Sequence, residues 1–384
     1  MNKLYSIIIM LLGVGFANAQ TLETLTNIPL DVEENSGMLL SSPNSIWLHN
    51  DSGDSAKLYQ IDTLGNLLRT VLVTNAINVD WEDITQDQQG NVYIGDFGNN
   101  SNNRQNLKIY KITHPDSIVG NTTTAEVIHY TYPDQTGFPP PDAQKHFDME
   151  AMFFLNDSLY LFSKNRTDPY DSYTKLYQIP ADTGVYVATL LDSFDTQQAG
   201  GFGAIFSITA AAISPNGQRV ALLNASTVWL FSNFKGHDFF NGQLQIFALG
   251  SISQKEALAF AANEVLYISD EKSVLGTCRL YRFDLQNVLT YTQKLENTAT
   301  GINIYPNPTR SHLNVAFKVL KGTKISMALK TINGKMLKKW KGTHYHSGQH
   351  DVKLNFRDVE TSTGWHILML KVDGKKQVYR VLLN

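Results

Sequence analysis

The chain has 384 residues, a length that fits two or three folding units, and its 42% apolar and 17% charged residues exclude a disordered tail. A single cysteine, Cys278, excludes an internal disulfide framework and a multi-cysteine zinc site. The net charge of −3 hides a division of charge along the chain. Residues from Gly301 onward hold 15 Lys and Arg against 4 Asp and Glu, whereas the rest hold 17 against 31. We therefore expect two electrostatically different modules.

The first residues have the pattern of an export signal. Lys3 precedes an apolar run that ends in small residues up to Ala19, which predicts Sec-dependent export and cleavage after this residue. The run is shorter than the roughly 20 residues that a membrane-spanning helix needs, and no later stretch is long and apolar enough. We therefore expect a signal peptide over residues 1–19 and no transmembrane segment. An uncleaved N-terminal anchor is the lesser alternative.

Residues 20–298 repeat one pattern five times. Each unit has a first run with small or acidic residues, a turn, a β-rich second run that ends near Asn or Asp, and then one or two further apolar runs. The first runs are SGMLLS, WEDIT, DMEAMFF, ITAAAIS and KEALAF. Four antiparallel strands at a period of about 45 to 68 residues predict an all-β domain, a β-propeller with five or six blades. The run near Thr26 either closes the ring or belongs to a sixth blade, and a series of separate β-sandwiches is less favoured.

The repeat predicts which residues meet at one mouth of the propeller channel. The first strand of each blade lines the channel, so the start of strand one and the end of strand two lie on the same face. Carboxylate and amide oxygens on this face suit a hard cation such as Ca²⁺. The competing interpretation is that Asn and Asp recur because they make turns. The residues collected there are Glu82, Asp83, Asp148, Glu150, Glu256, Asn50, Asp51, Asp96, Asn165, Asn224 and Asp270.

The order of these motifs, from HNDSGD through WEDIT and YIGDFGNN to DMEAM and EALAF, resembles a group of secreted bacterial propeller proteins. It is similar, more loosely, to phytase-like esterase and NHL-type propellers, over most of residues 22–298. The resemblance implies a metal at the channel mouth, and the matching positions are Glu82, Glu150, Glu256, Asn50, Asp96 and Asn165. Four basic residues at or near the same mouth are candidates for holding an anionic ligand. They are His49, Arg104, Lys164 and Arg166.

The C-terminal part predicts a separate small domain. We expect a linker at residues 299–301 and a β-sandwich of six or seven strands at residues 302–384, with tight turns at Asn333-Gly334 and Asp373-Gly374. The segment resembles the type A C-terminal sorting domain of the type IX secretion system. This resemblance implies contact with the secretion machinery, passage across the outer membrane, and a propeller that is secreted or held at the cell surface. A surface-binding sandwich, for example for polysaccharide, is the alternative. The resemblance is carried by Tyr305, Pro306, Asn307, Pro308, Gly364, Trp365 and the run Lys375–Leu383.

Two functions of different classes follow from the propeller. The first is an exported, non-catalytic protein that binds a glycan, a protein or a small molecule at one channel face. The alternative is a calcium-dependent hydrolase of a phosphate or carboxylic ester, in which Glu82, Glu150 or Glu256 serves the chemistry. The chain lacks the complete catalytic set of any one hydrolase family. Its acidic propeller offers nucleic acid no basic surface, so we expect no nucleic-acid partner.

Overall fold

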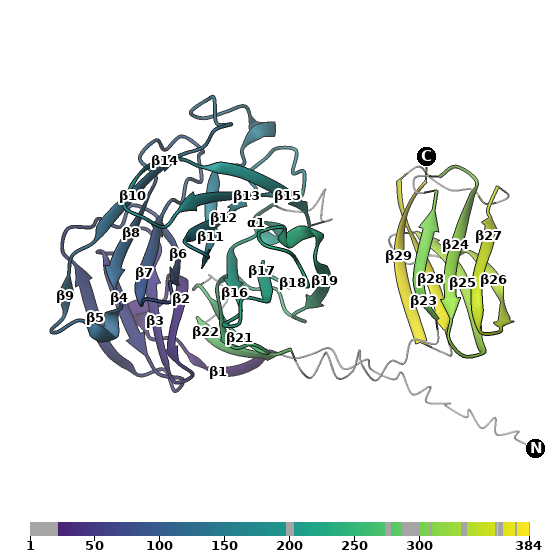
Figure 1. Cartoon of the computed structure of the whole chain (residues 1–384), viewed down its shortest axis with the longest axis horizontal. Coiled ribbons are helices and arrows are strands. Elements are labelled where there is room, and N and C mark those ends of the chain that lie inside the picture. The colour runs from purple at the N-terminus through teal and green to yellow at the C-terminus, as the bar shows by residue number, and fades with distance from the viewer. Residues whose placement is uncertain are drawn as a thin grey trace, which may run out of the picture. The chain divides into compact units, whose positions relative to one another are not determined.

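The computed structural model describes residues 22–196, 203–272, 278–285, 299–306, 309–331, 336–357, 359, 364–372 and 375–383. The chain forms two compact units, residues 1–288 and residues 289–384 (Figure 1). The predicted signal peptide lies outside the described residues, as do Asn307 and Pro308 and the two predicted tail turns. No described helix is long and apolar enough to cross a membrane.

The described residues of the first unit form five β-sheets, each with four antiparallel strands, which are the blades of a propeller. Blade 1 holds β2 (Asn35–Ser42), β3 (Ser45–Asn50), β4 (Lys57–Ile61) and β5 (Leu67–Val73). Blade 2 holds β6 (Trp81–Gln86), β7 (Asn91–Asp96), β8 (Lys108–Thr113) and β10 (Glu126–Thr131). Blade 3 holds β11 (Asp148–Leu155), β12 (Ser158–Lys164), β13 (Tyr173–Pro180) and β15 (Thr189–Asp195). Blade 4 holds β16 (Ala210–Ile213), β17 (Arg219–Leu223), β18 (Thr227–Ser232) and β19 (Gln243–Ala248). Blade 5 holds β20 (Lys255–Ala262), β21 (Val265–Asp270), β22 (Arg279–Asp284) and β1 (Glu23–Asn27).

Local sequence explains the hairpins inside the blades. The turns between first and second strands contain residues with positive φ, such as Gly90 (φ 85°), Asn156 (φ 49°) and Gly217 (φ 68°). Gly and Asn tolerate this left-handed conformation, which matches the twist of a two-stranded hairpin. Each predicted pair of runs therefore folds back on itself.

The five blades form a closed ring. The inner strands β2, β6, β11, β16 and β20 each contact the next, and β20 contacts β2. Five buried apolar clusters fill the five spaces between neighbouring blades, including the space between blade 5 and blade 1. Strand β1 pairs with β22 as the outermost strand of blade 5. The run near Thr26 therefore closes the ring, and the blade count within the described residues is five.

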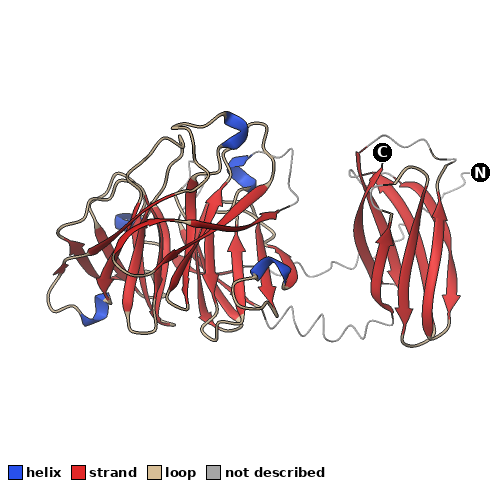
Figure 2. Ribbon diagram, turned by 45° about the horizontal axis from the view of Figure 1, so that its top comes forward, coloured by secondary structure: helices blue, strands red, loops and turns tan. Residues whose placement is uncertain are grey.

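Two short strands tie neighbouring blades together at their outer edges. Strand β9 (Thr122–Thr123) pairs in parallel with β5, and β14 (Gly184–Val187) pairs in parallel with β10. Both precede the outermost strand of the following blade, so each connection covers an edge that would otherwise leave backbone groups unpaired. Helical structure among the described residues is confined to short turns, drawn blue in Figure 2. These are η1 (Leu30–Val32), η2 (Pro115–Ser117), η3 (Asp142–Gln144), η4 (Phe239–Asn241) and α1 (Gly203–Phe206).

The second unit is a β-sandwich of two sheets. One sheet has the order β23-β24-β27 and the other β26-β25-β28-β29, with a shared apolar core that includes Leu313, Phe317 and Leu368. The terminal strand coincides with the predicted run. The residues that we assigned to a linker, 299–301, instead lie in β23, because pairing with β24 begins at Ala299. The strands are β23 (Ala299–Tyr305), β24 (His312–Val319), β25 (Thr323–Thr331), β26 (Met336–Tyr345), β27 (Gly348–Asn355), β28 (Gly364–Val372) and β29 (Lys375–Leu383).

Candidate functional site

A β-bulge near the start of the inner strand recurs in four of the five blades. Near the starts of β2, β6, β11 and β20 the register with the second strand shifts, so one residue at this point of each strand is left without a partner, and β2 and β20 have a second shift near their ends. A bulge re-aims the side chain of the extra residue. Strand β16 pairs with β17 without such a shift. The four bulged residues are Ser36, Glu82, Glu150 and Glu256, so the repeat places three glutamates at equivalent positions.

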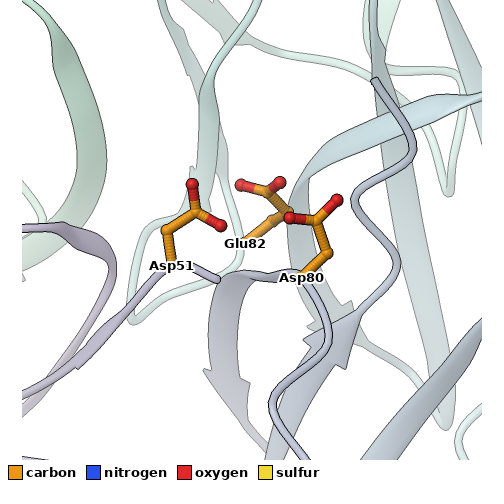
Figure 3. Close-up of side chains that lie close together, drawn as sticks. All are labelled: Asp51, Asp80 and Glu82. Atoms are coloured by element: carbon orange, nitrogen blue, oxygen red, sulfur yellow. The ribbon is translucent and has the colours of Figure 1, made fainter. Parts of the chain in front are cut away.

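Three carboxylates meet at the first group of this site, as Figure 3 shows. Asp51 follows β3, Asp80 precedes β6, and Glu82 is the bulged residue of β6. One oxygen of each lies within 4.8 Å of the others. The Ser36 hydroxyl donates to Glu82 Oε2 at 3.1 Å and to the Glu82 carbonyl at 2.8 Å, which fixes the bulge across blades 1 and 2.

A second group shares Glu82 and contains two basic residues. Glu82, Asp148 and Glu150 again place carboxylate oxygens within 4.8 Å of one another. Arg166 Nε lies 2.6 Å from Asp148 Oδ2, and Lys164 Nζ lies 3.0 Å from Glu150 Oε2. Arg166 also contacts Glu150 Oε1 at 3.4 Å. The charges of Asp148 and Glu150 are therefore compensated by partners on the end of β12, whereas the first group has no such partner among the described ion pairs.

Burial and mutual repulsion disfavour the charged forms of the acids. Burial, together with nearby Asp51 and Asp148, raises the pKa of Asp80 to about 7. Burial and the Glu150 carboxylate raise the pKa of Glu82 well above its usual range. Burial also raises the pKa of Glu271, which follows β21, to about 8, with a contribution from the neighbouring Glu256. A cation among these groups would relieve the repulsion.

Glu256 adds an unsatisfied oxygen to the same mouth. Its side chain is 10% exposed, and Oε2 has no hydrogen-bond partner within the described part of the chain. Lys164 Nζ lies 3.8 Å away, beyond hydrogen-bonding distance. Burial raises the pKa of Glu256, and the charge of Asp51 acts in the same direction. Burial acts to lower the pKa of Lys164, but Glu150 and Glu256 raise it above its usual value.

The structure assigns other contacts to three of the predicted metal ligands. Asn50 Nδ2 donates to the Asp31 carbonyl and to Asp54 Oδ2, both at 2.9 Å. Asn165 Nδ2 donates to the Tyr173 carbonyl at 2.8 Å. Asp96 forms ion pairs with Arg104 at 2.8 Å and Lys108 at 3.5 Å. Asn50 and Asp96 end a second strand, Asn165 directly follows one, and all three stabilise the loop that comes next, which is the turn-forming role of Asn and Asp. We therefore do not retain Asn165 and Asp96 in the candidate site. Asn50 Oδ1, the oxygen that could bind a cation, has no hydrogen-bond partner within the described residues.

The four predicted basic residues divide into two pairs. Lys164 and Arg166 lie in the site. His49 is fully buried, its Nδ1 lies 3.1 Å from the Asn50 carbonyl, and its ring meets Trp81 edge-on at 5.6 Å. Burial lowers the pKa of His49 to about 4, so the ring is neutral at pH 7. Arg104 is held by Asp96 and by the Gly98 carbonyl at 2.7 Å. Neither His49 nor Arg104 belongs to the candidate site.

Asp80 and Glu271 are site residues that the sequence reasoning missed. Asp80 lies two positions before Glu82 in the segment NVDWED. Residues two apart on an extended chain point to the same side, and this spacing could have indicated that Asp80 lies beside Glu82. Glu271 directly follows Asp270, the residue that ends β21, and of these two acids the sequence pattern singled out only Asp270. Asp51 and Asp148 were placed at the mouth but were not selected as ligands. Their proximity to Glu82 depends on contacts between blades, which a repeat pattern does not specify.

Comparison with known proteins assigns the C-terminal unit. Residues 303–384 match the family described as secretion system C-terminal sorting domain. The tail is a sorting domain. It implies interaction with the type IX secretion machinery and places the protein at the cell surface or in the extracellular space. The sorting domain accounts for about one fifth of the chain, and the propeller precedes it.

Solved structures similar to this chain include other proteins of diverse activity. The PQQ-bound aldose sugar dehydrogenase of Streptomyces coelicolor has 11% identity and a TM-score of 0.40, with 69% of this chain and 98% of that chain covered. PorZ, a surface component of the type IX secretion system of Porphyromonas gingivalis, has 14% identity and a TM-score of 0.27, with 91% and 51% covered. Regucalcin, a calcium-binding protein of Agrobacterium tumefaciens, has 12% identity and a TM-score of 0.35, with 65% and 75% covered. No curated protein matches the chain in sequence. The propeller assignment rests on the closed ring of blades described above.

Proposed function

We propose that the exported propeller is a binding protein whose channel mouth holds a calcium ion at Asp51, Asp80 and Glu82. The observation that carries this proposal is the convergence of three carboxylates that no described lysine or arginine neutralises through an ion pair. Burial raises the pKa of both Asp51 and Asp80, and the charge of Asp51 adds to the rise at Asp80, so a cation between them would relieve the repulsion. Glu256 Oε2, buried and without a hydrogen-bond partner within the described residues, supports the proposal as a further oxygen at the same mouth.

Calcium fits the chemistry of these ligands better than a transition metal does. Ca²⁺ takes six to eight oxygen ligands in flexible geometry, and every candidate ligand here is a carboxylate oxygen. No described histidine or cysteine belongs to either acidic group, so the soft or nitrogen ligands that favour zinc or copper are absent from the described site. Three carboxylates leave further coordination positions, which water or an oxygen-bearing ligand would fill. A glycan, a protein carboxylate or a small molecule with oxygen donors fits that position.

Thermal unfolding of the mature full-length chain in calcium and in EDTA tests the cation site. A ligand that binds only the folded state raises the melting temperature, and we expect a rise of several degrees in calcium. Asp80→Asn should abolish the rise because it removes one negative ligand. Asp182→Asn, at an exposed carboxylate after β13, is the matched control and should retain it. Equal melting temperatures with calcium and EDTA in the unsubstituted chain would overturn the proposal.

A second candidate function is a calcium-dependent hydrolase of phosphate or carboxylic esters. The observation that favours it is Glu150, a carboxylate beside Glu82 whose pKa is raised by burial above its usual range, as suits a group that takes a proton from water. A bound cation would polarise the ester oxygen. Assays with p-nitrophenyl phosphate and p-nitrophenyl acetate decide between the two functions. Turnover that needs calcium and is lost in Asp80→Asn supports the hydrolase, and calcium binding without turnover supports the binding protein.

A further inference from the structure

The larger sheet of the sorting domain carries charge of one sign only. Its strands β25, β26, β28 and β29 contain nine Lys and Arg and no Asp or Glu. Two of the nine lie on β25, three on β26, one on β28 and three on β29. The smaller sheet, formed by β23, β24 and β27, contains two lysines and one aspartate. The positive charge on the strands of this domain is therefore concentrated on one sheet.

Strand alternation places several of these lysines on the outer face of the larger sheet. Successive side chains of a strand point to opposite faces, and the core residues of β25 and β28 occupy alternate positions. Ala328, Lys330 and Lys371 lie next to core residues along these strands, so they face away from the core. Lys339 of β26 pairs with Ala328 and shares its face. The core residues on β25 and β28 are Ile325, Met327, Leu329, Leu368, Leu370 and Val372.

The lysines of this outer face are accessible. Lys339 and Lys371 are exposed, and Lys330 is half-buried. None of the three takes part in an ion pair with another residue that the structure describes. From Gly301 onward the sequence has only four acids to set against 15 Lys and Arg. The charge of this face is therefore left for a partner to neutralise.

Apolar side chains lie among these lysines on the same face. Met369 pairs with Ala328, and Ile367 pairs with Lys330. Both apolar side chains are half-buried, yet neither packs in the core of the sandwich. A lysine can lay its methylene stem along such apolar groups while its ammonium reaches an anion above them. An apolar centre with lysines around it is typical of surfaces that bind the headgroup region of an anionic membrane.

We propose that the outer face of the larger sheet docks on an anionic lipid membrane. The lipid phosphates contact Lys330, Lys339 and Lys371, and the side chains of Ile367 and Met369 enter the headgroup region. Charge complementarity confines the attraction to the sorting domain, because the rest of the chain holds 31 Asp and Glu against 17 Lys and Arg. The proposal goes beyond the cation site of the propeller and does not depend on it.

Cosedimentation of the mature full-length chain with lipid vesicles tests this docking face. One set of vesicles contains phosphatidylcholine alone, and the other contains phosphatidylcholine and phosphatidylglycerol. We expect at least tenfold tighter binding to the anionic vesicles, and this binding should weaken as salt is added, because salt screens the attraction. EDTA is present throughout, so calcium cannot link the acidic propeller to the lipid. Equal binding to both sets, or binding to neither, would overturn the proposal.

Matched charge reversals on the two sheets locate the contact. Lys339→Glu together with Lys371→Glu should weaken binding to anionic vesicles at least tenfold. Lys318→Glu together with Lys353→Glu makes the same change of charge at exposed positions of the smaller sheet and should change the affinity less than threefold. An unchanged melting temperature shows that each variant is folded. Equal losses in the two double variants would mean that net charge drives binding, and would refute the docking face.

Substitution of the apolar centre separates a membrane from a soluble acidic partner. Ile367→Ser should weaken binding to anionic vesicles at least threefold, because less apolar surface enters the headgroup region, and Met369→Ser should act in the same direction. Neither change should alter the affinity for heparin, a soluble polyanion that contacts only the charges. Unchanged vesicle affinity in both variants would assign the face to a soluble acidic partner and overturn the membrane proposal.

Discussion

Asp83 connects three blades through one buried carboxylate. Besides the N–H groups of Ile84 and Met152, it interacts with the backbone of Ala211, so β6, β11 and β16 all contact the same side chain. Burial raises the pKa of Asp83, and these backbone donors oppose the rise. The residue therefore stabilises the ring where no apolar side chain could satisfy the N–H groups.

Replacing Asp83 with Asn tests this role. The amide NH₂ of Asn would face a backbone N–H, leaving a buried donor unsatisfied, and we expect a loss of about 2 to 3 kcal/mol in the free energy of unfolding. Urea denaturation measures the loss. The exposed control Asp182→Asn should change the free energy by less than about 0.5 kcal/mol. Equal stability of the two variants would show that Asp83 is not a structural link.

The affinity for calcium should depend on pH through Asp80. Protons compete with a cation for a carboxylate, and the pKa of Asp80 near 7 places this competition at neutral pH. Between pH 8 and pH 6 the ionised fraction of such a group falls about tenfold, so the affinity should fall about tenfold over this range. Calcium titration by calorimetry at both pH values measures the change. The same affinity at pH 6 and pH 8 would contradict the raised pKa.

The stability of the cation-free protein should fall as the pH rises. Asp80, Glu82 and Glu271 have pKa values raised by burial, so the folded state holds protons that the unfolded state has already lost. Stability decreases with pH wherever the folded state binds more protons. In EDTA we expect a lower melting temperature at pH 8 than at pH 5, and added calcium should recover part of the difference at pH 8. A higher melting temperature at pH 8 than at pH 5 in EDTA would contradict the raised pKa values of these acids.

The sequence predicted the central glutamates of the site but not all of its members. Glu82, Glu150 and Glu256 follow the same repeated pattern, so their equivalent positions near the starts of the first strands could be inferred from the repeat, but the β-bulge at these positions could not. The acids at the ends of the second strands looked equivalent in sequence, yet Asp96 is paired with Arg104 from its own blade, whereas Asp51 faces Asp80. Whether an acid at the end of a second strand faces the channel mouth depends on the conformation of the loop that follows. Loop conformation differs from blade to blade, so the repeat does not predict it.

At the scale of elements, β1 supplies the last strand of a blade whose other strands lie at the far end of the propeller sequence. It covers the edge of β22, and Leu22 and Leu25 pack against the cores beside blade 5. An uncovered edge strand is prone to pair with another molecule. Main-chain hydrogen bonds between β1 and β22, together with apolar contacts, therefore stabilise the closed ring.

Removing β1 should open the ring. A chain that begins at residue 29 lacks the pairing with β22, and we expect a melting temperature at least 10 °C lower and a tendency to aggregate, because the missing strand removes both hydrogen bonds and buried apolar side chains. A chain that begins at residue 22 retains β1 and is the control. Differential scanning calorimetry and light scattering compare the two. Identical melting temperatures would show that blade 5 is stable as three strands.

The repeat pattern predicted the first three strands of every blade and a fourth strand in most of them, because alternation and turn residues are local signals. It left open whether the run near Thr26, which forms β1, belongs to blade 5. It did not predict β9 and β14, which pair in parallel with strands of the preceding blade. Nor did it predict that residues 299–301 lie in β23. Short polar segments carry no periodicity of their own, and their pairing is decided by the edge that they meet.

At the scale of the whole molecule, the sorting domain and the propeller are separate compact units with opposite charge. Deletion of residues 303–384 should leave the propeller folded but retained in the periplasm of a host with a type IX secretion system. Cell fractionation with immunodetection measures its location, and circular dichroism of the truncated protein checks its fold. The full-length chain is the control. Appearance of the truncated protein outside the cell at the control level would contradict the sorting role.

Closure of the ring by β1 has a consequence for the order of events in export. Arg282 and Glu23, which form an ion pair beside the β1–β22 pairing, are 259 residues apart. In a chain that emerges from the inner membrane N-terminus first, β1 is translocated before the strands of every blade. It can pair only after β22, the third strand of the last blade, has also been translocated. Contacts of such long sequence separation form slowly. The first segment across would thus be the last to dock, and the propeller would stay open until nearly all of it had been translocated.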